Sequence, residues 1–285
     1  MDATRRRSKL IGALCAAALM ALAASADVEA KDTITWGWID NAPGSMPTGA
    51  DQNRGIEDQI RALLKERLNG YEHEEVQAPI PRVVNEIKTG NHWCATGFVK
   101  TAERETFASF SVPAAFWLPP KIIIQKERRA EFESFGELSL EQLLANHALR
   151  TGVVRGRAYS PTIDALLQRN PPAEFNSDYI DGLKMLLSDR LDYVIELPIR
   201  ANYTTRRLGS EGKLVALPFK EMSNHITTHV MCPKNEWGAK VIDAINAVLR
   251  VERPSPRYRQ IIELWSDEDS IRQIRKVYDS VLLKD

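Results

Sequence analysis

The sequence lacks an excess of charge of either sign and contains few cysteines. Lysine plus arginine and aspartate plus glutamate number 38 each, so the chain is without the surplus of basic residues that is typical of general nucleic-acid binders. Of the three cysteines, Cys15 lies in an N-terminal apolar run, which leaves Cys94 and Cys232 for the rest of the chain. We therefore expect no nucleic-acid partner.

Motifs of several common catalytic classes are also missing. The sequence has neither a Gly-x-Ser-x-Gly nucleophile elbow nor a Gly-rich phosphate loop that ends in Lys-Ser or Lys-Thr. His225 and His229 have the spacing of a helical metal pair, but their segment is predicted as a strand, and the glutamate of a metalloprotease motif is absent. We predict no metal site, no cofactor and no catalytic constellation.

Long apolar runs are absent except for one at the N-terminus. The run from Leu10 to Ala24 follows a basic segment, Arg5–Lys9, and ends in Ala24-Ser25-Ala26, the pattern of a secretory signal peptide over residues 1–26. Roughly 15 apolar residues are too few to span a bilayer comfortably. No second run approaches that length, so we predict a periplasmic protein that does not span the membrane after signal cleavage.

What the chain does contain is an alternation of strand and helix patterns. β-branched and aromatic runs predict strands, and apolar residues at helical spacing predict helices. The predicted strands lie at 34–38, 76–80, 149–156 and 191–197, and the predicted helices at 55–68, 82–88, 178–189, 235–249, 257–265 and 270–283. This order predicts an α/β fold in which helices cover a mostly parallel sheet.

The stretch from Cys94 to Pro113 is predicted as strand, turn and helix. Thr101 can cap the helix because its hydroxyl accepts hydrogen bonds from first-turn amides, and Arg104 falls at about the third helical position. A guanidinium beside such amides is suited to a carboxylate or a phosphate. The alternative is a surface ion pair between Arg104 and Glu103 or Glu105, a kind of contact that contributes only ~0 to 1 kcal/mol.

Two motifs in this stretch carry a family resemblance. Thr101-Ala-Glu-Arg104 followed by Phe110-Ser111-Val112-Pro113 resembles the Thr-x-x-Arg and Phe-Ser-x-Pro signature of family 3 extracellular solute-binding proteins. Those periplasmic receptors deliver polar amino acids and similar molecules to ABC importers, and their matching arginine holds the α-carboxylate of the ligand. The segments 151–156 and 190–195 also resemble strands of that family.

The resemblance implies a periplasmic-binding-protein-like (type II) fold of two lobes joined by two hinge crossings. Lobe 1 would comprise residues 27–123 and 220–285, and lobe 2 residues 124–219. Each lobe would be a mostly parallel sheet flanked by helices. In this fold the strands that hold Cys94 and Cys232 are neighbours, so the resemblance implies a disulfide between them, although their spacing alone cannot pair them.

The resemblance also implies a set of ligand-binding residues in an interlobe cleft: Arg104, Thr101, Thr96, Gly97, Trp38, Asp40, Tyr159, Ser160 and Glu196. For Trp38 and Tyr159 the alternative is packing in the core. Leu197 stands where amino-acid receptors place the aspartate that binds the ligand's ammonium, and Glu196 is expected to point to the opposite side of the strand. A carboxylate-bearing ligand without an α-amino group therefore stays open.

The function that follows is capture of a small polar, carboxylate-bearing solute, an amino acid or a related molecule, for an ABC importer. The predicted partners are the solute and an ABC permease in the inner membrane, and the protein is predicted to be a monomer. One alternative is a dehydratase-like cleft enzyme, for which Glu196, His92 and Lys100 are the only candidate proton donors. The other is a periplasmic signalling or interaction module.

Overall fold

The computed structural model describes residues 31–46, 48–172, 174–176, 178–222 and 225–284. The chain divides into two units, residues 1–32 and 33–285, and the fold described below is that of the second. The predicted signal peptide over residues 1–26 lies outside the described residues. Within the described residues, no helix combines the length and the apolar character that a bilayer crossing requires.

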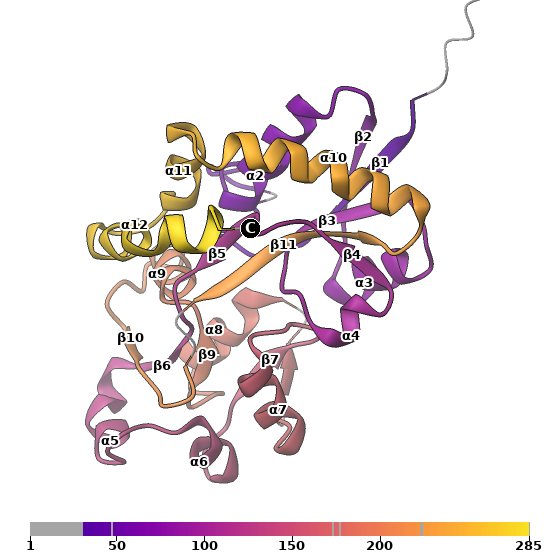
Figure 1. Cartoon of the computed structure of the whole chain (residues 1–285). Coiled ribbons are helices and arrows are strands. Elements are labelled where there is room, and N and C mark those ends of the chain that lie inside the picture. Colours follow the sequence, from indigo (N-terminus) through magenta and orange to yellow (C-terminus); the bar gives the residue numbers. More distant parts are fainter. Residues whose placement is uncertain (1–30, 47, 173, 177, 223–224, 285) are drawn as a thin grey trace, which may run out of the picture. The chain divides into compact units, whose positions relative to one another are not determined.

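The first sheet contains six strands and has the order β2-β1-β3-β11-β4, with β5 also paired to β11 (Figure 1). Its strands are β1 (Thr33–Trp38), β2 (Glu72–Gln77), β3 (Trp93–Phe98), β4 (Ala108–Phe110), β5 (Ala115–Trp117) and β11 (Ile226–Pro233). β1 pairs in parallel with β2 and β3, whereas β11 runs antiparallel to β3, β4 and β5. A late segment of the chain thus returns to the sheet beside β3.

Helices pack on both faces of this sheet because neighbouring strand residues point to opposite sides. Cys94 of β3 belongs to a core with α2 (Ile56–Arg67), α10 (Glu236–Glu252), α11 (Pro256–Glu263) and α12 (Glu268–Leu282). The next residue, Ala95, belongs to a second core with Val83 and Ile87 of α3 (Ile80–Lys88). The end of β3 is therefore fixed from both sides.

Two smaller sheets follow between β5 and β11. β6 (Lys121–Gln125) is the central strand of a sheet with β9 (Val194–Glu196) and β10 (Leu214–Leu217), and β7 (Gly152–Val154) pairs in parallel with β8 (Glu174–Asn176). The helices of this part are η1 (Lys126–Arg128), α5 (Arg129–Glu133), α6 (Leu140–Ala145), α7 (Pro161–Arg169), α8 (Tyr179–Leu187) and α9 (Pro198–Arg207). They cover two further apolar cores.

The predicted α/β alternation is confirmed, and three details differ. β6 runs antiparallel to both β9 and β10, and β11 runs antiparallel to three strands of the first sheet, so neither of these sheets is mostly parallel. β6 leads the chain from the first sheet into this part of the fold, and β10 leads it back toward β11. The two strands therefore run in opposite directions where they pair. The strand predicted at 76–80 lies at 72–77, since Pro79 caps α3, and the sequence analysis missed α9. The exact lobe boundaries stay a prediction.

The predicted disulfide is confirmed. Cys94 of β3 and Cys232 of β11 are bonded, and their Cα atoms lie 4.4 Å apart on neighbouring antiparallel strands. Both residues are fully buried. The bond joins positions 138 residues apart and ties the returning strand to the one that leads into Arg104.

Candidate functional site

The turn after β3 places Arg104 as the sequence analysis predicted. Thr101 caps the single-turn helix α4 (Ala102–Glu105), and its Oγ1 accepts a hydrogen bond from the backbone N–H of Arg104 at 3.2 Å. The cap fixes the backbone of Arg104 directly after the disulfide-tied strand. Its side chain therefore starts from a well-defined position.

The guanidinium of Arg104 is buried and is held by backbone carbonyls. Only 8% of the residue is exposed. Nη1 donates to the carbonyl of Val99 at 2.8 Å, Nη2 donates to the carbonyl of Gly156 at 2.9 Å, and the Phe98 ring centroid lies 5.1 Å from Cζ. Because Val99 follows β3 and Gly156 follows β7, Arg104 links the first sheet to the β7–β8 sheet.

Arg104 has no acidic partner at ion-pair distance in the described part of the chain. The surface-pair alternative with Glu105 does not occur, since Glu105 pairs with Lys100 at 2.8 Å. Burial lowers the pKa of Arg104, and the negative charges of nearby Asp164 and Glu103 only partly offset that effect. A buried cation that is held by neutral carbonyls can accept an anion.

A hollow of about 650 Å³ opens beside Arg104. Its polar lining includes Lys100, Thr101, Arg157, Ser160 and Asp164, and its apolar lining includes Leu167, Pro171, Pro172 and Phe175. Ser160 caps α7 and accepts a hydrogen bond from Ile163 N, and Asp164 accepts one from Tyr159 N at 2.9 Å. The hollow is within the size range of small-molecule sites.

A buried ion cluster lies next to this hollow. Arg157 binds Glu196 at two points, with N–O distances of 2.6 and 2.9 Å, and Arg200 of α9 binds the same carboxylate at 2.5 Å. The backbone N–H of Leu197 donates to Glu196 at 2.7 Å, and the Tyr179 ring centroid lies 4.9 Å from Cζ of Arg157 and 4.1 Å from Cζ of Arg200. Burial alone would raise the pKa of Glu196, but the two guanidiniums hold it below its ordinary value.

A second buried carboxylate, Glu57 of α2, packs against Gly97. It accepts a hydrogen bond from Asn41 Nδ2 at 3.2 Å, and burial raises its pKa. Gly97 has φ of +80°, and a Cβ at that position would collide with the Glu57 carboxylate, so the close approach needs glycine. Glu57, Gly97, Arg157, Tyr179 and Arg200 line a cavity of only about 40 Å³.

The other predicted ligand residues lie in different surroundings. Thr96 is buried within β3, and Tyr159 is buried in the core, where its hydroxyl donates to the carbonyl of Ile195 at 3.3 Å. Trp38 ends β1, with Arg61 Cζ 5.7 Å from its ring, and burial together with Asp178 raises the pKa of Asp40. Neither the 650 Å³ hollow nor the 40 Å³ cavity includes these four residues in its lining.

The three candidate proton donors of the enzyme alternative have other roles in this structure. Glu196 is kept ionised by two arginines, which makes it a weak proton donor. Lys100 pairs with Glu105, and the His92 ring stacks on Trp237 with centroids 4.1 Å apart. Among the described residues, no cluster of three or more side chains could hold a metal ion.

The sequence analysis missed most residues of the small cavity, among them Asn41, Glu57, Tyr179 and Arg200. A local signal existed for one of them. Glu196 and Arg200 are four residues apart across Pro198, and proline in the first helical turn followed by such a pair is typical of a helix start. Glu57 and Tyr179 lie on helices that were predicted, but their convergence depends on tertiary packing.

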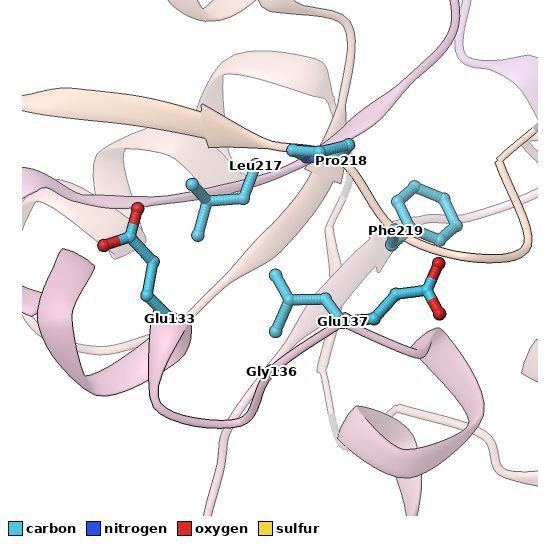
Figure 2. Close-up of a pocket in the computed structure, with 7 residues that line it drawn as sticks. Glu133, Gly136, Glu137, Leu217, Pro218 and Phe219 are labelled. Carbon is cyan, nitrogen blue, oxygen red and sulfur yellow. The ribbon is translucent and has the colours of Figure 1, made fainter.

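Another hollow, of about 300 Å³, shares no lining residue with the two described above (Figure 2). Figure 2 shows Leu217, Pro218 and Phe219 facing the turn that carries Gly136. Its charged lining residues are Glu133 and Glu137, both acidic, and its lining includes none of the predicted ligand residues. An acidic rim is unsuited to a carboxylate, so this hollow is not the site that Arg104 suggests.

No family profile matches the chain, and no curated protein matches its sequence. Solved structures do match. ArgBP from T. maritima is 18% identical, with 82% of this chain and 94% of that chain covered at a TM-score of 0.66. The VFT2 domain of BvgS from Bordetella pertussis is 19% identical, with 82% and 93% covered at 0.61.

A histidine kinase sensor domain with similarity to periplasmic binding proteins is also similar. It is 14% identical, with 83% of this chain and 96% of that chain covered at a TM-score of 0.65. One of these neighbours is thus named as a binding protein and one as a sensor domain. At such low identity the likeness shows the fold, which is periplasmic-binding-protein-like and mixed α/β, as the sequence analysis predicted.

Proposed function

We propose that this chain is a periplasmic solute receptor in which Arg104 binds the carboxylate of a small solute. One observation carries the proposal: a buried guanidinium without an acidic partner in the described residues lies on a hollow of about 650 Å³. A guanidinium has five N–H groups, so the two carbonyl contacts leave donors for a ligand. Thr101 and Ser160 line the same hollow.

A carboxylate is a better partner for Arg104 than the carbonyls that it now contacts. The hydrogen bonds of Arg104 to neutral carbonyls have one charged partner, whereas a carboxylate adds an opposite charge and can accept two parallel N–H bonds from the guanidinium. A bound carboxylate would compete with Gly156 for Nη2 and would itself contact both sides of the hollow. Ligand contacts that differ between two arrangements of the lobes would shift their populations, which is how closure would report binding.

The biological role that we propose is delivery of the solute to an ABC permease in the inner membrane, after export through the signal peptide at residues 1–26. The fold is shared with the substrate-binding protein of an amino acid ABC transporter, which supports this role by analogy. The proposed receptor acts as a monomer. Trp38, Asp40, Thr96, Gly97, Tyr159 and Glu196 would act by shaping the site and not by direct contact.

The second candidate is a signalling module. The observation that favours it is the small cavity of only about 40 Å³, which is lined by the chain's own Glu57, Arg157 and Arg200. A module of this kind can hold its arrangement without a solute. The histidine kinase sensor domain among the structural neighbours shares the fold.

A binding screen tests the proposal. Purified residues 27–285 are heated with amino acids, polyamines, dicarboxylates and other small acids, and hits are measured by calorimetry. A ligand at about 100 times its Kd should raise the free energy of unfolding by about 2.7 kcal/mol. Arg104→Gln should abolish the shift, whereas Arg82→Gln, which alters an exposed arginine near Glu86, should keep it.

The receptor and the signalling module predict different results in this screen. Saturable binding that requires Arg104 supports the receptor. Specific crosslinking to a periplasmic or membrane protein, together with no shift for any acid in a folded sample, would support the signalling module instead.

A further inference from the structure

The small cavity beside Gly97 has no space for an organic solute. Its volume is about 40 Å³, and Glu57, Arg157 and Arg200 contribute side chains to its lining. One water takes about 30 Å³ in the liquid. Glu196 binds both Arg157 and Arg200, so each of these guanidiniums already has an acidic partner. A solute therefore has to lie in the neighbouring hollow.

The charges of the larger hollow favour an acid. Three cations line it, and two of them are paired: Lys100 with Glu105 and Arg157 with Glu196. Arg104 is the third, and no ion pair of this residue occurs in the described chain. Two acids, Glu103 and Asp164, also line the hollow. Half-buried Asp164 already accepts a hydrogen bond from the Tyr159 amide and interacts with the charges of Arg104 and Arg157. A ligand ammonium in the hollow would lie close to these cations and would be repelled by them.

The remaining wall of the hollow is apolar. Leu167 of α7, Pro171, Pro172 and Phe175 of β8 contribute to it. Phe175 is 48% exposed, although large aromatic side chains are mostly buried. Its ring centroid lies 5.0 Å from Arg155 Cζ, which helps to hold the ring in place. An apolar group bound in the hollow would bury these side chains and exclude water from them.

We propose that the solute is an amphipathic acid without an ammonium group: its carboxylate binds Arg104, and its apolar body lies against Leu167, Pro171, Pro172 and Phe175. The inference rests on the proposed function and narrows its substrate class. Charge complementarity to Arg104 sets the orientation, and burial of the apolar body adds affinity in proportion to the area covered. Highly polar amino acids lack such a body.

Matched pairs of acids test the substrate class. Calorimetry compares 3-phenylpropanoate with phenylalanine and 4-methylpentanoate with leucine, and succinate serves as a polar acid. We expect each des-amino acid to bind at least about tenfold more tightly than its amino acid and than succinate. Equal or tighter binding of the amino acids or of succinate, lost in Arg104→Gln, would overturn this inference and leave the proposed function intact.

Two phenylalanines of similar exposure provide a control for the wall. Phe175 is 48% exposed in the hollow, and Phe135 is 45% exposed outside its lining. Phe175→Ser should weaken 3-phenylpropanoate about tenfold, and Phe135→Ser should leave its affinity unchanged. Equal effects of the two substitutions would overturn the proposed wall. Absence of binding by every acid, in protein that circular dichroism shows to be folded, would overturn both the inference and the proposed function.

Discussion

The structure contains two kinds of buried arginine close together. Arg157 and Arg200 have an acidic partner, and Arg104 has none among the described residues. Arg157 and Arg200 share the carboxylate of Glu196, at N–O distances of 2.5 to 2.9 Å. In the described part of the chain, the Arg104 guanidinium donates only to the carbonyls of Val99 and Gly156. The residue type and the burial are alike, so the partner decides whether an arginine is part of the internal structure or is available to a ligand.

The cost of burying a charge explains the difference. An ionised group loses its hydration when it is buried, and an opposite charge with good geometry is needed to offset that loss. Glu196 provides this for Arg157 and Arg200, and the Tyr179 ring adds contacts with both guanidiniums. For Arg104 the offset is incomplete, and a bound anion would complete it.

Removal of Glu196 should have the largest effect. Glu196→Gln leaves Arg157 and Arg200 buried without a negative partner, and loss of one partner of a buried pair costs about 3 to 5 kcal/mol. Denaturant unfolding of residues 27–285 measures the loss. Glu105→Gln, which breaks an exposed pair with Lys100, is the control and should cost ~0 to 1 kcal/mol. Equally small losses of stability in the two variants would show that the buried cluster contributes no more than a surface pair.

Acid should weaken the Glu196 cluster before it affects Arg104. The pKa of Glu196 lies below its ordinary value of 4.5 in the folded chain, so its contribution is present above about pH 4.5 and is lost as pH falls through the folded pKa. Unfolding measured from pH 7 to pH 3 should show a smaller acid-induced loss in Glu196→Gln than in the natural sequence. A parallel loss in both proteins would show that the cluster does not cause it.

Glu57 should show the opposite pH dependence. Burial raises its pKa above 4.5 in the folded chain, so its favourable contribution is present below about pH 4.5 and is lost as pH rises through the folded pKa. Compared with the natural sequence, Glu57→Gln should therefore be relatively more stable at pH 7 than at pH 4. The difference between the two free energies of unfolding, measured at both pH values, checks the sign. A constant difference would contradict it.

Replacement of Arg104 should change stability least. Arg104→Met removes the buried charge but leaves two carbonyls without this donor, and we expect these effects to offset each other to about 1 kcal/mol. Binding of any acid should nevertheless disappear. The measurements are denaturant unfolding and calorimetry of the same samples. A loss of stability as large as that in Glu196→Gln would mean that Arg104 is an internal structural residue, as Arg157 and Arg200 are.

Local features of the site could be predicted, and long-range ones could not. The cap at Thr101 and the position of Arg104 depend on four consecutive residues, and both were predicted. Helix α9 was missed because its segment contains polar residues, Asn202 to Arg207, and no clear apolar periodicity. Arg200 was missed with it. The ion pair of Arg104 with Glu105 was weighed as an alternative, but Glu105 pairs with Lys100.

The sequence by itself determined the alternation of strands and helices, the capped turn that carries Arg104, and the family resemblance that implied the Cys94–Cys232 disulfide. The alternation and the capped turn depend on short sequence patterns, and the implied disulfide depends on the order of strands in the family's fold. Only the tertiary structure decided which arginine has an acidic partner. Arg104 meets Gly156 from 52 residues away, and Arg200 meets Asn41 from 159 residues away. Contacts between such distant positions depend on how sheets and helices pack, which no local pattern records.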